Sequence, residues 1–324
     1  MCMMNKYIGH PNQISGVEEM RLSGGKADNM RMLYIRNGKG LDFWISADRC
    51  ADISRLSFKG VNYGYFSPCG YVAPQYYDCN GDGFLKSFTA GFMTTCGLTA
   101  VGSPCTDDGE KLPLHGTISN MPCENIYHYY DDKCIIIKAI IRDASLFFRK
   151  LVLSREYIVS LEKNEIILRD TVMNEGSAES PVEILYHCNI GYPLLDENAV
   201  IEIPAQGIEP RNAYAVSGIE DCLRVEKPCN GYEEMCFYHK LKGNPEISVF
   251  NPSKSRGMKL TYNAEELKCF TQWKMMGEYD YVMGLEPGNC YPDGRDVMRK
   301  KGMLEFLKPG QSKTYCLKFE FTEE

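Results

Sequence analysis

The sequence predicts an all-β protein built from antiparallel strands. Short segments with alternating or continuous apolar character recur in both halves of the chain, and many of them are separated by connections of hairpin length. Helical periodicity is scarce, so helices of about 10–15 residues that could connect parallel strands are missing. These observations together favour a large antiparallel sandwich or barrel.

The first half of the chain supplies six of the expected strands. They are residues 32–37, 41–47, 53–58, 135–141, 147–154 and 157–163. The connections at 37–40, 131–133 and 163–165 are rich in Asn, Asp, Gly and Lys, and residues of the first three types tolerate tight turns. Antiparallel meanders are therefore expected.

The second half continues the same pattern. Its expected strands are residues 165–174, 182–189, 247–251, 258–262, 268–273, 281–286 and 315–321. Only 82–91 and 295–302 resemble a helical turn or two, and neither is long enough to cross over a sheet.

The chain has 324 residues, a length that one large all-β domain can reach, and no internal repeat or Pro/Ser-rich linker divides it. We therefore expect a single domain over 1–324. Residues 63–117 differ from the rest, being rich in Gly, Pro, Tyr and Cys and poor in strand periodicity. A segment this long with little regular structure is expected to build a site.

The charge balance argues against nucleic acid as a partner. Lys and Arg number 36 against 43 Asp and Glu, giving a formal net charge of -7. The longest apolar run, 134–141, contains Lys138 and is far shorter than the ~20 residues of a bilayer span. With no charged and apolar leader at the N-terminus, we expect a cytoplasmic protein without membrane contact.

The cysteines predict neither a disulfide framework nor a metal site. They number 15, an odd count, and are scattered along the chain, which favours reduced thiols. Cys222, Cys229 and Cys236 are evenly spaced, but no CxxC occurs, so structural zinc is not expected. The sequence also lacks GxGxxG, GxSxG and GxxxxGK[ST], the motifs of dinucleotide, serine-hydrolase and P-loop sites.

Two of the five histidines lie in unusual settings and are candidate proton donors. His115, in LHG, lies near the end of the 63–117 segment, and His187, in YHCN, lies inside a predicted strand. A lone histidine is more often a hydrogen-bonded structural residue, and we interpret His10, His128 and His239 in that way.

Glu286, in GLEPGN, ends an apolar run just before a turn. A carboxyl group at the mouth of an apolar sandwich has a raised pKa, which suits a general base, although a solvated carboxylate at a strand end is equally compatible with the pattern. Asp48 and Asp52 flank Arg49, which favours a structural ion pair over a ligand contact. Residues 94–99, TTCGLT, could form a loop that offers backbone donors to a sugar, or a tight turn.

In order along the chain, the motifs DRCADI, TTCGLT, LHGTIS, YHCNIGYPLLD and GLEPGNCYPDGR resemble those of the galactose mutarotase-like superfamily, the aldose 1-epimerases. The resemblance covers nearly the whole chain. It implies a β-supersandwich of antiparallel strands with a concave face that binds a sugar. It further implies that His187 protonates the ring oxygen, Glu286 takes the proton of the anomeric hydroxyl and His115 positions the substrate. Neither a metal nor an organic cofactor is implied.

The sequence departs from the best-known members around His115, which lies in PLHGT rather than in an Asn-His pair before Gly-Gly. Further candidates for contact with the substrate are the following residues: Arg49, Arg295, Asp48, Trp273 and Asn189. The arginines could bind an anionic group, and the indole of Trp273 could support the apolar face of a sugar ring, unless it packs in the core.

The first functional hypothesis is an aldose 1-epimerase-like isomerase that interconverts the anomers of a monosaccharide or derivative. Two alternatives remain open: a non-catalytic carbohydrate-binding protein on the same scaffold, and an enzyme that eliminates or isomerises an oxidised sugar. The sequence leaves the oligomeric state open, and a homodimer is one candidate because exposed edge strands often pair.

Overall fold

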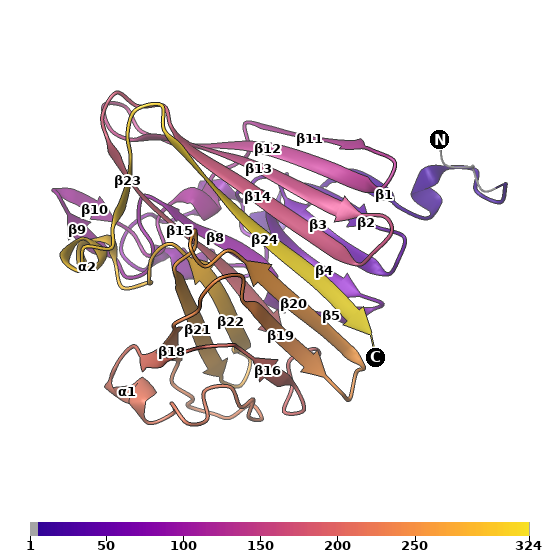
Figure 1. Cartoon of the computed structure of the whole chain (residues 1–324). Coiled ribbons are helices and arrows are strands. Elements are labelled where there is room, and N and C mark those ends of the chain that lie inside the picture. Colours follow the sequence, from indigo (N-terminus) through magenta and orange to yellow (C-terminus); the bar gives the residue numbers. More distant parts are fainter. Residues whose placement is uncertain (1–5, 324) are drawn as a thin grey trace.

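The protein consists of antiparallel β-sheets with a few short helices (Figure 1), as the sequence predicts. The structure is a computed structural model, which describes residues 6–323. No helix within these residues is long and apolar enough to cross a bilayer.

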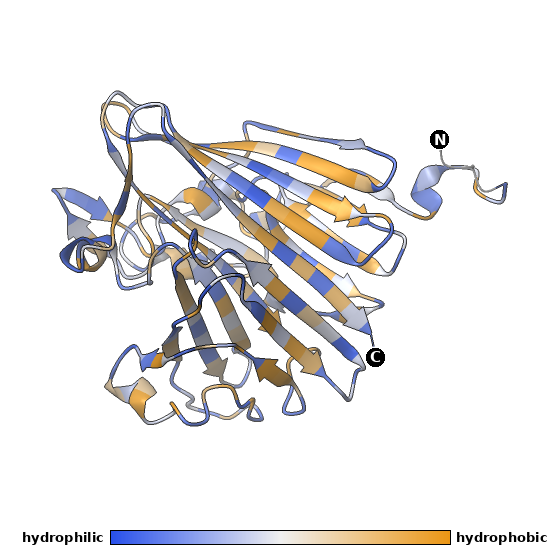
Figure 2. Ribbon diagram, in the orientation of Figure 1, coloured by the Kyte–Doolittle hydropathy of each residue, from blue (hydrophilic) through white to orange (hydrophobic). Residues whose placement is uncertain are grey.

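An eight-stranded sheet forms the broad curved layer at the front of Figure 1. In spatial order its strands are β11 (Asn125–Tyr130), β12 (Cys134–Ala144), β13 (Lys150–Ser160), β14 (Glu165–Asn174), β24 (Ser312–Glu323), β20 (Arg256–Tyr262), β19 (Glu246–Asn251) and β16 (Val200–Glu202). Apolar and polar residues alternate along β12, β13, β14 and β24 (Figure 2), so one face of this sheet is buried and the other is exposed.

A second sheet carries the candidate site. Its spatial order is β17 (Ile208–Pro210), β18 (Met235–His239), β21 (Cys269–Met276), β22 (Tyr281–Gly288), β15 (Ser180–Gly191) and β23 (Glu305–Leu307), and β8 (Met93–Leu98) also pairs with β15. Strands β8, β15 and β22 are almost wholly buried, so exposed polar positions do not alternate with buried ones along them as they do in the eight-stranded sheet.

The N-terminal region forms a five-stranded sheet. Its strands are β1 (Gly16–Arg21), β2 (Arg31–Arg36), β3 (Leu41–Ser46), β4 (Asp52–Phe58) and β5 (Val61–Asn62). Two small pairs, β6 (Tyr65–Phe66) with β7 (Ala90–Gly91) and β9 (Cys105–Asp107) with β10 (Glu110–Leu112), lie in the predicted site-building segment.

The helices are short. They are α1 (Ala213–Val216), α2 (Arg295–Lys300) and the 3₁₀ turns η1 (Pro11–Gln13), η2 (Gly25–Ala27), η3 (Pro74–Tyr76), η4 (Gly83–Lys86) and η5 (Ile118–Asn120). The two helical turns expected from the sequence correspond to η4 and α2.

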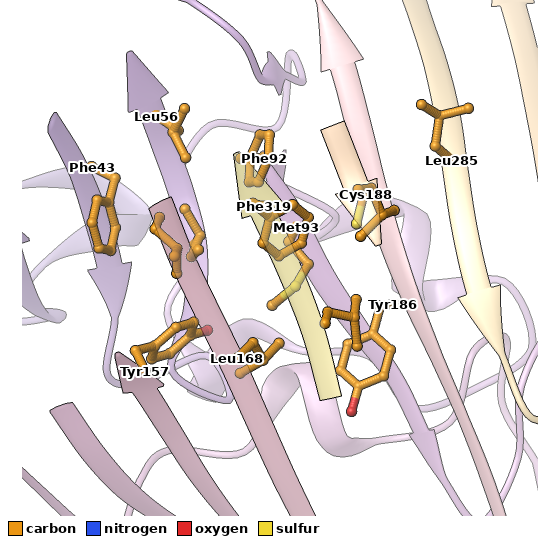
Figure 3. Close-up of a cluster of buried hydrophobic side chains, with 14 of the residues drawn as sticks. Phe43, Leu56, Phe92, Met93, Tyr157, Leu168, Tyr186, Cys188, Leu285 and Phe319 are labelled. Carbon is orange, nitrogen blue, oxygen red and sulfur yellow. The ribbon is translucent and has the colours of Figure 1, made fainter. Parts of the chain in front are cut away.

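One large hydrophobic core joins the sheets. Residues from all three sheets meet in it, as Figure 3 shows for Phe43, Leu168, Tyr186 and Phe319. A cluster of charged side chains is also buried between the sheets. Arg155 donates hydrogen bonds to Asp170 at 2.7 and 2.9 Å and to Asp52 at 2.6 Å.

Two predicted elements are wrong in detail. Residues 147–154 and 157–163 are not two strands, because β13 runs without a break from Lys150 to Ser160 and buries the charged Arg155 against Asp170. Residues 94–99 are neither a loop nor a tight turn, since residues 93–98 form strand β8, which pairs with β15 and is buried along its whole length. His128 lies in β11.

Candidate active site

The candidate site is a cavity of about 380 Å³ over the middle of the second sheet. Strands β15 and β22 are paired with Cys188 opposite Leu285, and this register places His187 opposite Glu286. On the other side of β22, Glu286 pairs with Thr271 of β21. All three of these side chains line the cavity.

His187 and Glu286 are in direct contact on the cavity floor. Nε2 of His187 lies 3.3 Å from Oε1 of Glu286, and the two residues are only 5% and 2% exposed. Gly284 makes room for this carboxylate, because a Cβ at that position would lie 2.2 Å from Oε1 of Glu286. Among the described residues, no hydrogen bond satisfies Oε1 of Glu286 or Oγ1 of Thr271, so both atoms are available to a ligand.

Burial shifts the pKa values of this pair in opposite directions. Removal from water lowers the pKa of His187 to about 3, and the neighbouring His115 adds to the shift. Burial raises the pKa of Glu286 well above its ordinary value, with Glu234 contributing and Arg211 opposing. Burial thus disfavours the charged form of each group, the imidazolium of His187 and the carboxylate of Glu286.

His115 approaches the same cavity from the predicted site-building segment. Its ring centroid lies 5.7 Å from that of His187, although the two residues are 72 positions apart in the sequence, the difference of 187 and 115. The backbone N–H of Gly102 donates to Nδ1 of His115 at 3.4 Å. Burial lowers the pKa of His115 to about 4, so the ring is neutral and its proton is on Nε2.

Aromatic rings complete the walls around the histidines. Trp273 is partly exposed rather than packed in the core, and its ring meets that of His187 edge-on at 5.2 Å. Its indole N–H donates to Glu234 at 2.7 Å. The ring centroid of Phe88 lies 5.3 Å from that of His187, and the ring centroid of Phe84 lies 5.1 Å from that of His115.

Sequence reasoning missed Arg211, which is the cation that lines the cavity. Its guanidinium donates to Oγ of Ser103 and to the carbonyl of Pro292, both at 3.0 Å, and lies 3.7 Å from Asp293. Arg211 follows a three-residue strand, and nothing in the local sequence marks it. Thr271 was also missed, although its alternation with Trp273 in β21 places both side chains on one face.

Three predicted ligand contacts lie elsewhere. Arg49 is buried and donates to the carbonyls of Ser119 and Val72, both at 2.7 Å. Asp48 accepts from Arg31, and Arg295 is held by Asp107 and Glu110. None of the three lines the cavity, because each is used in an internal contact that fixes the fold.

Asn189 lies one step along β15 on the same face as His187. Its amide donates to the carbonyl of His187 at 2.8 Å, and Asn189, a predicted substrate contact, does not line the cavity. Within residues 6–323, no group of three or more His, Cys, Asp or Glu residues is arranged to hold a metal ion.

The other histidines have structural partners. His239 is buried in β18 and lies 2.9 Å from the side-chain oxygen of Gln272, while Nδ1 of His10 accepts from the backbone of Asn12. His128 lies 3.7 Å from Glu19.

The family described as a domain of unknown function, DUF4432, matches residues 27–321. A solved structure of a "putative aldose 1-epimerase" from Klebsiella pneumoniae subsp. pneumoniae MGH 78578 is 27% identical, with a TM-score of 0.90 over 95% of this chain and 83% of that one. No curated protein matches the chain.

More distant structures share the fold. A galactose mutarotase-like protein from Clostridium acetobutylicum is 14% identical, with a TM-score of 0.69 over 97% of this chain and 100% of that one. Galactose 1-epimerase from Lactobacillus acidophilus NCFM is 13% identical, with a TM-score of 0.63 over 95% and 99%. The chain has a galactose mutarotase-like fold, as its motifs indicate.

Proposed function

The chain belongs to the DUF4432 family, and from this premise we propose that it is an aldose 1-epimerase-like isomerase that interconverts the anomers of a monosaccharide. The observation that carries the proposal is the contact of His187 Nε2 with Glu286 Oε1, on the floor of a cavity that also contains His115 and Trp273. The similarity to the Klebsiella protein described as a "putative aldose 1-epimerase" supports the same reaction class.

Anomer exchange needs an acid at the ring oxygen and a base at the anomeric hydroxyl, and these two oxygens are bonded to the same carbon, C1, so neighbouring groups can serve both. In ring opening, Nε2–H of His187 gives its proton to the ring oxygen while Glu286 takes the proton of the anomeric hydroxyl, and the bond between C1 and the ring oxygen breaks. Rotation about the C1–C2 bond turns the aldehyde. Ring closure on the other face returns both protons, so the pair ends as it began.

The pair's proton count fits this cycle. Ring opening starts with His187 charged and Glu286 ionised, and it leaves His187 neutral and Glu286 protonated. Burial favours the state after ring opening, because neither His187 nor Glu286 is charged in it. Each group thus acts once as acid and once as base, and no proton has to be exchanged with water during a turnover.

The remaining wall residues suit a sugar. The indole of Trp273 offers an apolar platform, and the free hydroxyl of Thr271 and the neutral Nε2–H of His115 can bind hydroxyl groups. Arg211 adds a cationic donor at the side of the cavity.

The proposal is tested by exchange NMR on a panel of monosaccharides, comparing wild type with His187→Gln and with His128→Gln as a control outside the cavity. We expect wild type and the His128 variant to accelerate anomer exchange of at least one sugar and the His187 variant to lose about 10²–10⁴-fold. Sugar binding with no acceleration in wild type would instead favour a non-catalytic carbohydrate-binding protein. A product other than the second anomer would favour an elimination or another isomerisation.

A further inference from the structure

A second buried carboxyl group, outside the proposed chemistry, lies on the strand that carries His187. Glu183 of β15 is 0% exposed. Its Oε2 accepts a hydrogen bond from the backbone N–H of Val101 at 2.9 Å, and its Oε1 has no partner among the described residues. The side chain does not line the cavity, so it cannot contact the sugar.

The contact with Val101 fixes the segment against which His115 is bound. The next residue, Gly102, donates its N–H to Nδ1 of His115 at 3.4 Å and accepts the N–H of His115 at 2.9 Å. The carbonyl of His115 accepts from Gly97 at 3.1 Å, at the other end of the same segment. Residues 97–102 therefore set both the position and the tautomer of His115.

The backbone of the segment lies directly against a neighbouring loop at Gly102. Gly102 has φ +81°, and a Cβ at this position would lie 2.1 Å from the carbonyl of Pro292. Arg295 holds the middle of the segment, because its guanidinium donates to the carbonyl of Thr99 at 3.2 Å. Glu183 supplies the side-chain anchor at Val101, directly before the residue that touches His115.

We propose that Glu183 is a positioning residue for His115, anchoring residues 97–102 so that the N–H of Gly102 holds Nδ1 and leaves Nε2–H to face the cavity. The part of this inference that concerns substrate binding rests on the proposed function. The part that concerns the His115 ring stands without it.

The surroundings of Glu183 give this anchor a pH dependence. Burial raises its pKa to about 8, the hydrogen bond from the N–H of Val101 opposes this shift, and of the nearby charges Arg295 and Arg299 lower the pKa and Asp107 raises it. The nearby thiol of Cys290 has a pKa far above its ordinary value and stays neutral. Glu183 is thus neutral at pH 7, and its ionisation above pH 8 places a negative charge in a site without an ion-pair partner.

The test compares Glu183→Gln, Glu183→Leu and the control Val182→Ala by the ¹⁵N resonances of the His115 ring, assigned with His115→Gln. The glutamine keeps an acceptor for Val101, the leucine removes it, and the Val182 variant deletes buried methyl groups from the same strand without touching this contact. We expect the leucine variant to shift the ring signals toward mixed tautomers and to raise KM at least tenfold with little change in kcat. Glu183→Gln and Val182→Ala should retain the wild-type signals.

A titration from pH 7 to 9.5 provides a second measurement that needs only wild type and Glu183→Gln. We expect the wild-type His115 signals to change with a midpoint near pH 8 and those of Glu183→Gln to remain constant. Unchanged His115 signals in a folded Glu183→Leu protein would overturn the proposal. If that variant does not fold, a wild-type titration identical to that of Glu183→Gln would overturn it. The ring signals of the variants and the titration are both recorded without turnover, unlike KM and kcat. A failure of the proposed function is therefore recognised separately from a failure of this proposal.

Discussion

Replacing Glu286 with glutamine tests the catalytic pair with little structural change. The amide has the same shape as the carboxyl group, and the space above Gly284 that holds Oε1 remains available. The substitution removes only the ability to accept and return a proton. His187, 3.3 Å away, keeps a polar neighbour.

The expected loss follows from the role of a positioned base. Such a group contributes about 10²–10⁴-fold to the rate, equivalent to about 2.7–5.4 kcal/mol of activation free energy. Stability should move in the opposite direction. The folded-state pKa of Glu286 is raised, so its stabilising contribution is complete below the unfolded pKa and falls as the pH rises from there toward the folded value. The amide does not titrate, so Glu286→Gln should gain in free energy of unfolding relative to wild type between pH 5 and 7.

Exchange NMR at pH 7 measures the rate, and urea unfolding at pH 5 and 7 measures stability. Glu305→Gln is a matched control, because it makes the same chemical change at β23, where the carboxylate pairs with Lys268 and Lys313 outside the cavity. We expect the control to retain activity. A Glu286→Gln enzyme that keeps more than a tenth of the wild-type kcat/KM would refute the assignment of Glu286 as a base.

Three further outcomes are expected. Trp273→Ala should raise KM about tenfold, equivalent to about 1.4 kcal/mol of binding free energy, with kcat nearly unchanged, because it removes the apolar platform of the cavity. Initial-rate measurements over a range of sugar concentrations give both constants. Arg155→Met should lower the free energy of unfolding by about 3–5 kcal/mol in urea titrations, since it leaves the buried Asp170 without its cation, and a change below about 1 kcal/mol would contradict this reading. The kcat/KM of the wild type should stay level from pH 5 to 7.5, because the low pKa of His187 and the raised pKa of Glu286 keep one proton on the pair in the free enzyme. A midpoint near pH 6.5 would contradict this, because it is the value of an unperturbed imidazole.

The strands could be predicted wherever side-chain burial is one-sided or continuous. Residues 165–174 alternate as β14, and 281–285 form an apolar run inside β22. The break predicted between 154 and 157 was wrong, because the charged Arg155 lies inside a continuous strand. Arg155 is instead buried by Asp170, which lies 15 residues further along and directly opposite in β14.

Strand β8 shows a second limit of local sequence. Residues 94–99 combine small threonine and cysteine side chains with a glycine, and the glycine is typical of a turn. The segment is a strand because β15 pairs with it and Asp52 binds the hydroxyl and the N–H of Thr95 at 2.6 and 2.9 Å. Partners outside the segment decided its conformation.

The sequence by itself determined the fold class, the chemical types of the candidate groups and the segment that forms one wall of the cavity. His115, His187 and Glu286 could be named because their short motifs resemble a known family. Only the tertiary structure decided which side chains share the cavity. It placed Arg211 there and kept Arg49 and Arg295 in internal contacts, because strand register and buried hydrogen bonds between distant segments fix where each guanidinium lies.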